Sequence, residues 1–259
     1  MTTFAARQLD AVLQVTASRS MTGQPLLGAV ATVVAEAADA DCVSIFELDP
    51  RACQARDLST VVRDGNLEDD PETEGLFWDA YPDSVCSWTD PGSPWFGKHP
   101  RRSPLAPEEA YPSWRAFQES QMSRTYGRAV GLGHYVIVPL TSEPSVTRRL
   151  LVNRPVGESA FSEDELTMLR LLQPHLDSAV GRALSGQAAE ELLTPRELEI
   201  LAYVRGGRST RDIASLLWVS TSTVRKHMEN VYAKLGVHSR AEAVAFVSGH
   251  RGAAVVSSG

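Results

Sequence analysis

The chain has 259 residues, of which 43% are hydrophobic and 22% are charged, values that are typical of globular proteins. It contains no apolar run long enough to span a membrane, and its start, MTTFAARQLD, lacks the basic residues and apolar core of a secretory signal. Arginine far outnumbers the 3 lysines, as in proteins from GC-rich bacterial genomes. We therefore expect a cytoplasmic bacterial protein with no membrane partner.

The charge is unevenly distributed along the chain. Residues 194–259 hold 9 basic and 5 acidic side chains, whereas residues 1–193 hold 16 basic and 27 acidic ones. Two of the 3 lysines, Lys226 and Lys234, stand close together in the C-terminal part. An acidic body with a basic C-terminal quarter favours an anionic partner, such as nucleic acid, for that quarter.

Residues 1–161 show the pattern of an α+β domain. Ala-, Leu- and Val-rich segments predict two helices, and four apolar runs predict strands, the last two joined by a turn around Glu143–Ser145. An acidic loop and an irregular insertion dense in proline and aromatic residues separate the second and third strands. The expected helices are 4–18 and 25–39, the strands 42–48, 58–63, 134–140 and 146–154, the loop 65–75 and the insertion 77–126.

A long linker helix is predicted over residues 162–190. Ser162 and Glu165 form a capping box that begins it, and Pro174 should kink it. Its apolar stripe is typical both of a helix packed on its own domain and of a dimer seam, and both interpretations stay open. Gly186–Glu191 is interpreted as a weak linker. The stripe consists of Leu169, Leu172, Leu176, Ala179 and Ala183.

Residues 191–249 predict a compact helical domain. The motifs TPRE, STRD and SRAE and an N-cap at Ser220 mark four helix starts. Gly206 and Gly207 end the first helix, and Gly236 ends the third. The tail, residues 250–259, is expected to be disordered. The predicted helices span 195–204, 210–217, 221–235 and 240–247.

The helix over 221–235 has two different faces. One face is a stripe of Val224, Met228, Val231 and Leu235, which is expected to be buried, and the other is polar or short-chained. The preceding helix ends so close to Ser220 that the two helices must cross at a large angle, as in a helix-turn-helix. The second helix of such a pair can enter the DNA major groove. In the turn, Trp218 is expected to pack between the helices, and His227 is expected to be a packed histidine.

The segment LTPRELEILAYVRGGRSTRDIASLLWVSTSTVRKHMENVYAKLGVHSRAEAV, residues 193–244, resembles the DNA-binding domain of the LuxR-type transcriptional regulators. The resemblance is free of gaps and covers about a fifth of the chain. It implies a four-helix domain that binds as a dimer to an inverted-repeat operator. The family's base-reading positions fall on Arg225, Lys226 and Glu229. Its phosphate-contacting positions fall on Ser209, Ser222, Thr223, Lys234 and Arg240.

Glu229 departs from the family, which often has a basic or neutral residue at this position. A carboxylate that faces DNA is unfavourable unless it accepts a hydrogen bond from cytosine N4. Alternatively, Glu229 pairs with Arg225 at the i+4 spacing and orients that side chain. Both roles stay open.

The first 190 residues lack so specific a signature. A phosphoacceptor receiver needs a lysine after a late strand, but Lys98 is the only lysine before residue 226 and lies in a proline-rich loop. FWDAYPDS (77–84) has the residue types of an acyl-homoserine-lactone pocket with the wrong spacing. The order of helices, strands, HYVIVPL, RRLLVNR and a capped helix resembles a GAF-type sensor domain, which implies a central antiparallel sheet with helices and often a pocket.

The aromatic insertion offers candidates for such a ligand pocket. The same side chains could instead fill a core, and both interpretations stay open. The candidates are Trp78, Tyr81, Trp88, Trp114, Phe117 and Tyr126.

Motifs of common catalytic sites are missing. The sequence has no G-x-x-x-x-G-K-[ST], H-E-x-x-H or G-x-S-x-G, and its 3 cysteines form no C-x-x-C pair. We therefore expect no enzyme, no metal and no cofactor. The favoured hypothesis is a homodimeric transcription regulator that binds double-stranded DNA, senses a small molecule or partner through its N-terminal domain, and has RNA polymerase as a further candidate partner. The alternative is an interaction module that contacts other proteins without reading DNA.

Overall fold

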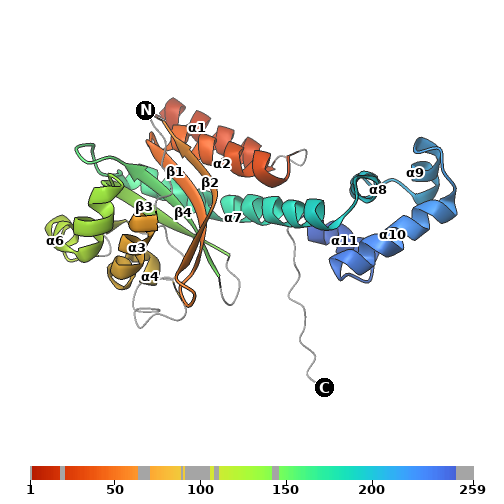
Figure 1. Ribbon diagram of the computed structural model, residues 1–259. Coiled ribbons are helices and arrows are strands. Elements are labelled where there is room, and N and C mark those ends of the chain that lie inside the picture. Colours follow the sequence, from red (N-terminus) through yellow and green to blue (C-terminus); the bar gives the residue numbers. More distant parts are fainter. Residues whose placement is uncertain are drawn as a thin grey trace, which may run out of the picture. The chain divides into compact units, whose positions relative to one another are not determined.

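The computed structural model (Figure 1) describes residues 2–17, 21–63, 71–88, 90, 106–107, 111–141 and 146–248. The described residues divide into two compact units. One unit comprises those within 1–18 and 27–177, and the other those within 19–26 and 178–259. The tail expected to be disordered and the turn expected around Glu143–Ser145 lie outside the described residues.

The first unit is built on a four-stranded antiparallel sheet with the strand order β2-β1-β4-β3. All four predicted strands are confirmed, although the second begins four residues earlier than expected. This sheet confirms the predicted α+β class. The strands are β1 (Cys42–Asp49), β2 (Gln54–Val62), β3 (His134–Leu140) and β4 (Thr147–Arg154).

Helices cover both faces of the sheet (Figure 1). One face carries the two predicted N-terminal helices, α1 (Thr2–Ala17) and α2 (Gly23–Ala37). The other face carries short helices from the aromatic insertion, which was predicted to be irregular. These are α3 (Pro71–Ala80), η1 (Tyr81–Asp83), α4 (Val85–Trp88), α6 (Trp114–Glu119) and η2 (Ser123–Gly127).

Helix α3 corrects the predicted acidic loop, because residues 71–75 are its first residues. Pro71 occupies a position where its missing N–H is not needed, and Glu72 and Glu74 lie in the first turn, where the helix dipole favours negative charge. The same residues that suggested a solvated loop therefore begin a helix.

Helix α7 (Glu163–Leu192) begins where predicted and has 30 residues. The amide and hydroxyl of Ser162 donate to Glu165 Oε2 over 2.7 and 2.8 Å, and the Glu165 amide donates back to Ser162 Oγ over 3.3 Å. The five residues of its apolar stripe are fully buried within the chain, which favours the packed interpretation over a dimer seam. The helix continues through Pro174, and the kink stays a prediction.

The weak linker predicted at Gly186–Glu191 is wrong, because these residues are the last turns of α7. A Cβ on Gly186 would lie 3.0 Å from the Thr22 Cβ and 3.2 Å from the Gly23 amide nitrogen. The absence of a side chain at Gly186 therefore lets α7 approach residues 22–23 closely, and it does not mark a flexible linker.

The second unit contains the four predicted helices. They enclose one apolar core with fully buried Ile200, Ile213, Val224 and Val231. No helix in the described ranges is long and apolar enough to cross a bilayer. The helices are α8 (Pro195–Arg205), α9 (Thr210–Leu216), α10 (Thr221–Leu235) and α11 (Arg240–Val247).

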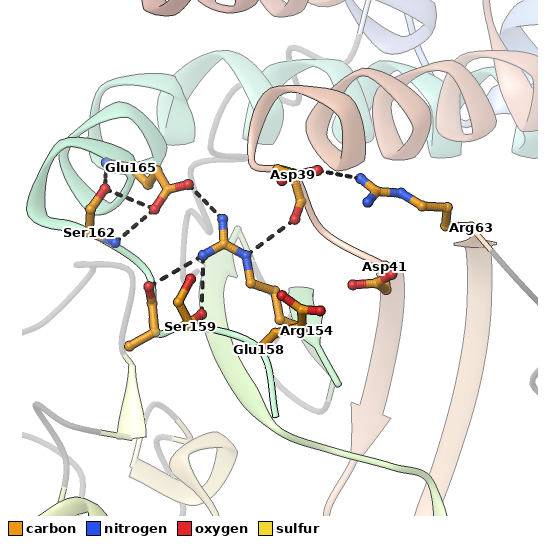
Figure 2. Close-up of a pocket in the computed structure, with 9 residues that line it drawn as sticks. Asp39, Asp41, Arg63, Arg154, Glu158, Ser159, Ser162 and Glu165 are labelled. Atoms are coloured by element: carbon orange, nitrogen blue, oxygen red, sulfur yellow. Dashed lines mark hydrogen bonds and ion pairs between the residues drawn. The ribbon is translucent and has the colours of Figure 1, made fainter. Parts of the chain in front are cut away.

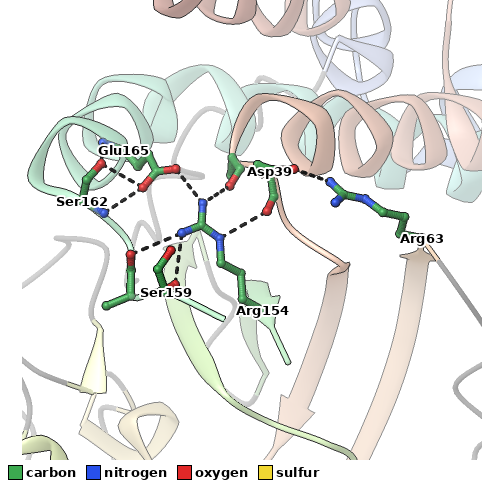
Figure 3. A network of polar contacts seen from close by, with 8 residues as sticks. Asp39, Arg63, Arg154, Ser159, Ser162 and Glu165 are labelled. Atoms are coloured by element: carbon green, nitrogen blue, oxygen red, sulfur yellow. Dashed lines mark hydrogen bonds and ion pairs between the residues drawn. The ribbon is translucent and has the colours of Figure 1, made fainter. Parts of the chain in front are cut away.

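A polar network closes one end of the sheet around Arg154 (Figure 3). The guanidinium donates to the carbonyls of Ala38, Asp39, Ser159 and Ala160 and forms a 2.6 Å ion pair with Glu165. It thereby joins the end of β4 to the end of α2 and the start of α7. A polar cavity of about 470 Å³ opens beside it, lined also by Asp41, Arg63 and Glu158 (Figure 2).

We expect Arg154→Met to lower the free energy of unfolding by about 3–5 kcal/mol, because it leaves Glu165 and four carbonyl groups without their donor. The matched control is Arg63→Met at the rim of the same cavity, which breaks an exposed ion pair with Asp39 and should change stability by less than about 1 kcal/mol. Denaturant unfolding measures both. Equal effects of the two substitutions would contradict the role of Arg154.

Candidate nucleic-acid interface

Helix α10 begins at a hydroxyl-rich N-cap. Ser220 Oγ accepts from the Thr223 amide over 3.0 Å and also lies 2.6 Å from Ser222 Oγ and 2.8 Å from Thr223 Oγ1. The helix ends at Gly236, whose φ of 64° provides the left-handed cap that was predicted. Both ends of the helix are thus fixed by local contacts.

The two faces of α10 are as predicted from their spacing. The apolar stripe of Val224, Met228, Val231 and Leu235 is buried in the core of the second unit. His227 lies half-buried between the two faces. The opposite stripe is exposed and consists of Ser222, Arg225, Lys226, Glu229 and Ala233.

The exposed stripe contains one ion pair and one unpaired cation. Lys226 Nζ lies 3.5 Å from Glu229 Oε2. Glu229 therefore pairs with Lys226, and not with Arg225 as the i+4 spacing suggested. Both side chains are well exposed, and such a pair contributes little to stability. Among the residues that the structure describes, Arg225 has no hydrogen-bond or ion-pair partner. Its guanidinium is available to an external ligand.

Three of the residues predicted to contact phosphate make local contacts. Ser209 forms a capping box with Asp212 at the start of α9, with a 2.7 Å hydrogen bond from its hydroxyl. Arg240 donates to the Arg208 carbonyl, and Thr223 contacts Ser220. These contacts hold the side chains near helix starts, where backbone N–H groups favour anions.

Lys234 binds within the domain. Its Nζ donates to Glu197 Oε2 over 2.7 Å, and the same oxygen accepts from the amide and hydroxyl of Thr194 over 2.8 and 2.9 Å. Burial raises the pKa of Glu197, but the hydrogen bonds from Lys234 and Thr194 outweigh it and lower the pKa to about 2. This carboxylate, whose side chain is only 4% exposed, joins the start of α8 to the last turn of α10.

Trp218 contradicts the prediction that it packs between the helices, because it is 94% exposed. Its φ of 55° lies in the left-handed region, which turns the side chain outward. The flanking Leu217 and Val219 pack against the core instead. Leu216 beside them is 49% exposed, so the turn presents apolar surface.

Comparison with known families identifies this unit. Residues 191–247 match the family described as bacterial regulatory proteins, luxR family. The C-terminal part of the chain is a LuxR-family domain. The match includes the whole of α8, α9, α10 and α11.

Two curated relatives match a stretch of the chain that is longer than the LuxR-family domain. The chain is 32% identical over 125 residues to the probable transcriptional regulatory protein NarL of Mycobacterium tuberculosis, covering 42% of this chain and 56% of NarL. It is 33% identical over 94 residues to the response regulator protein VraR of Staphylococcus aureus, covering 36% of this chain and 40% of VraR. The chain thus spans about half the length of the curated relatives it matches.

Solved structures include distant likenesses that cover most of the chain. SdiA in complex with octanoyl-rac-glycerol has a TM-score of 0.44 and 18% identity, covering 95% of this chain and 94% of SdiA. The four-stranded antiparallel sheet itself, and not this distant likeness, establishes the fold class of the first unit.

The aromatic pocket candidates meet in one cluster on the sheet face opposite α1 and α2. Tyr81 and Phe117 are buried, and Trp78, Trp114 and Tyr126 are partly buried against the same cluster. Trp114 also stacks on His134 with ring centroids 4.0 Å apart. The side chain of the sixth candidate, Trp88, lies outside the described part of the chain. The five described rings pack in a common core, and their use as a ligand pocket stays a prediction.

We expect Glu197→Gln to remove a pH-dependent part of the stability of the LuxR-family domain. The native pKa is lowered from an ordinary value of 4.5 to about 2, so the ionised carboxylate stabilises the fold above pH 4.5 and this contribution is lost as the pH falls toward 2. The stability difference between the native chain and the variant should therefore shrink over that window. Glu199→Gln, in an exposed pair with Arg196, is the matched control. Parallel pH profiles for all three proteins would contradict the assignment.

Replacing Trp218 by glycine should stabilise the domain by about 1 kcal/mol, because a non-glycine residue in the left-handed region is strained and this side chain is almost fully exposed. Leu216→Gly, at a half-exposed helical position next to it, should destabilise by about 1 kcal/mol. Thermal unfolding compares the two. A loss of stability in the Trp218 variant would show that the indole makes a contact that its exposure conceals.

Proposed function

We propose that the chain is a sequence-specific DNA-binding transcription regulator that inserts α10 into the major groove. The supporting observation is the exposed, unpaired Arg225 on a helix that is capped at both ends and packed into a LuxR-family domain. A guanidinium in this position matches the O6 and N7 acceptors of guanine as a bidentate donor. One such pair contributes about 1–3 kcal/mol of discrimination between bases.

The neighbouring residues complete the proposed interface. Lys226 and Glu229 form a solvent-exposed pair whose members can separate at little cost and contact different bases. Ser222, Thr223 and Ser209 lie at the starts of α10 and α9, where they would contact phosphates. Lys234 and Arg240 already have partners within the domain, so we assign them smaller contributions to phosphate binding.

The regulator is proposed to act as a homodimer on an inverted repeat, because a single short helix reads only a few base pairs. The first unit is proposed to sense a small molecule or a partner protein. We propose that the dimer has two arrangements that differ in how they place the two α10 helices. A ligand alters DNA binding only if its affinity for these two arrangements differs. RNA polymerase would be the partner of the DNA-bound dimer, and the regulator would act in the cytoplasm.

The exposed Trp218 and Leu216 support a second candidate function, in which the helical domain contacts another protein. Large exposed apolar side chains are typical of interaction surfaces. In that case Arg225, which has no partner among the described residues, would have no ligand. The two functions differ in whether Arg225 or Trp218 is needed for binding.

Selection from a random duplex library at two salt concentrations tests the proposal. We expect an inverted repeat to be enriched and its affinity to fall steeply with salt, because phosphate contacts release counterions. Arg225→Ala should weaken binding by about 1–3 kcal/mol and relax the preference at one base pair of each half-site. Arg115→Ala, which removes the same charge from an exposed pair in the first unit, is the control.

Recovery of no motif, or equal affinities for the Arg225→Ala variant and the native chain, would contradict DNA reading by this face. A loss of partner binding on replacing Trp218, with Arg225 dispensable, would favour the interaction function instead.

A further inference from the structure

Arg149 is buried in the first unit, under the aromatic cluster. It lies on the central strand β4, directly between Phe46 of β1 and Pro139 of β3. Its side chain is on the face covered by the aromatic cluster, because side chains alternate along a strand and Leu151 belongs to that cluster. Only 1% of the residue is exposed, and it is among the largest fully buried side chains of the chain.

Two of the three guanidinium nitrogens of Arg149 have no hydrogen-bond partner among the residues that the structure describes. Nη1 donates to the Arg148 carbonyl over 2.8 Å, whereas Nε and Nη2 are buried without a hydrogen-bond partner. Arg154, five residues along the same strand and on the opposite face, donates from all three nitrogens. A buried donor that is left unpaired destabilises a fold, so Arg149 is not explained by stability.

Three groups interact electrostatically with Arg149, but none of them satisfies its two unpaired nitrogens. They are the Cys86 thiol, the Tyr81 hydroxyl and the Asp90 carboxylate. Burial raises the pKa of Cys86 to about 11 and also raises the pKa of Tyr81, so both are uncharged at neutral pH. Tyr81 contacts Asp90 over a long 3.4 Å hydrogen bond. None of the three groups hydrogen-bonds to Nε or Nη2 of Arg149.

We propose that Arg149 is the recognition residue for a small organic carboxylate, which is the effector of the first unit. Nε and Nη2 are the adjacent pair on one edge of the guanidinium, and this edge binds a carboxylate through two parallel hydrogen bonds. The Asp90 carboxylate already acts on this guanidinium, so a ligand with one negative charge is favoured over a doubly charged phosphate monoester. The aromatic cluster around Tyr81 and Phe117 would contact the apolar body of the ligand.

The burial of Arg149 links binding to a change in structure. Because only 1% of the residue is exposed, a carboxylate reaches it only when the short helices over this face move. Binding therefore favours an arrangement of the layer that differs from the ligand-free one. The inference deepens the proposed sensing role and rests on it.

The first test compares two arginines of β4 in the full chain without ligand. Arg149→Met should raise the apparent Tm by about 2–4 °C, because an apolar side chain of similar length replaces an unpaired buried charge. Arg154→Met should lower it. If Arg149→Met lowers the Tm as strongly as Arg154→Met, then Arg149 is a structural residue and the proposal is overturned.

The second test uses octanoate and phenylacetate as probes, with octanamide and phenylacetamide as uncharged controls. At least one carboxylate should raise the Tm of the native chain while its amide does not, and Arg149→Met should abolish the shift. No carboxylate-specific shift, or an equal shift in the variant, would overturn the proposal.

DNA binding by the native chain, measured with and without the carboxylate that raises its Tm, separates the carboxylate site from the sensing role of the first unit. If the carboxylate binds through Arg149 and DNA affinity is unchanged, the carboxylate site stands and the sensing role fails. If DNA binding responds to other molecules while no carboxylate binds, the sensing role stands and Arg149 has been assigned wrongly.

Discussion

The packing of helix α10 on α8 depends on one buried carboxylate. Glu197 completes the N-terminal capping box of α8 and, through the same oxygen, binds Lys234 in the last turn of α10. A carboxylate buried to this extent requires several donors, and these come from two helices that are distant in sequence. The contact therefore fixes α10 on α8 at the end remote from its N-cap. The exposed face can then present Arg225 from a rigid support.

Two arginines of β4 show how one strand can serve stability and recognition. Arg154 points to the face covered by α1 and α2, and its donors are all used by carbonyl groups and Glu165. Arg149 points to the opposite face, where it meets aromatic and aliphatic side chains and retains two unused nitrogens. The chemistry of the side chain is identical. The difference lies in whether the covering layer offers backbone carbonyls or rings.

Local sequence signals predicted much of this fold, because capping and strand alternation act over a few residues. Ser162, Thr194, Ser209, Ser220 and Ser239 each cap the helix that they were expected to begin. The exposed face of α10 also followed from spacing alone. The errors concern residues whose environment is set by distant segments. Gly186 resembled a linker glycine because Thr22, which it approaches, is far away in sequence.

The same limit applies to the candidate sites. The family resemblance assigned Lys234 to a phosphate contact, and its partner Glu197, 37 residues away, could not be foreseen from the sequence. Trp218 was expected to pack between the helices because it lies in the turn that joins them, but the backbone of this turn is left-handed at Trp218 and the side chain is exposed. Arg149 lies in the run VTRRLLVNR, where five polar or charged residues obscure which face meets the core. Only the pairing of β4 with β1 and β3 places it among apolar neighbours.

The scarcity of lysine has a practical consequence for locating this protein on a chromosome. Formaldehyde captures protein–DNA complexes largely through lysine amines, and the chain contains only Lys98, Lys226 and Lys234. Of the two on α10, Lys234 is held by the buried Glu197, whereas Lys226 forms only a solvent-exposed pair with Glu229 and is the more accessible amine. Crosslinking yield in cells would then report on a single side chain. Under the proposed function, a low yield would reflect this amine chemistry rather than weak DNA binding.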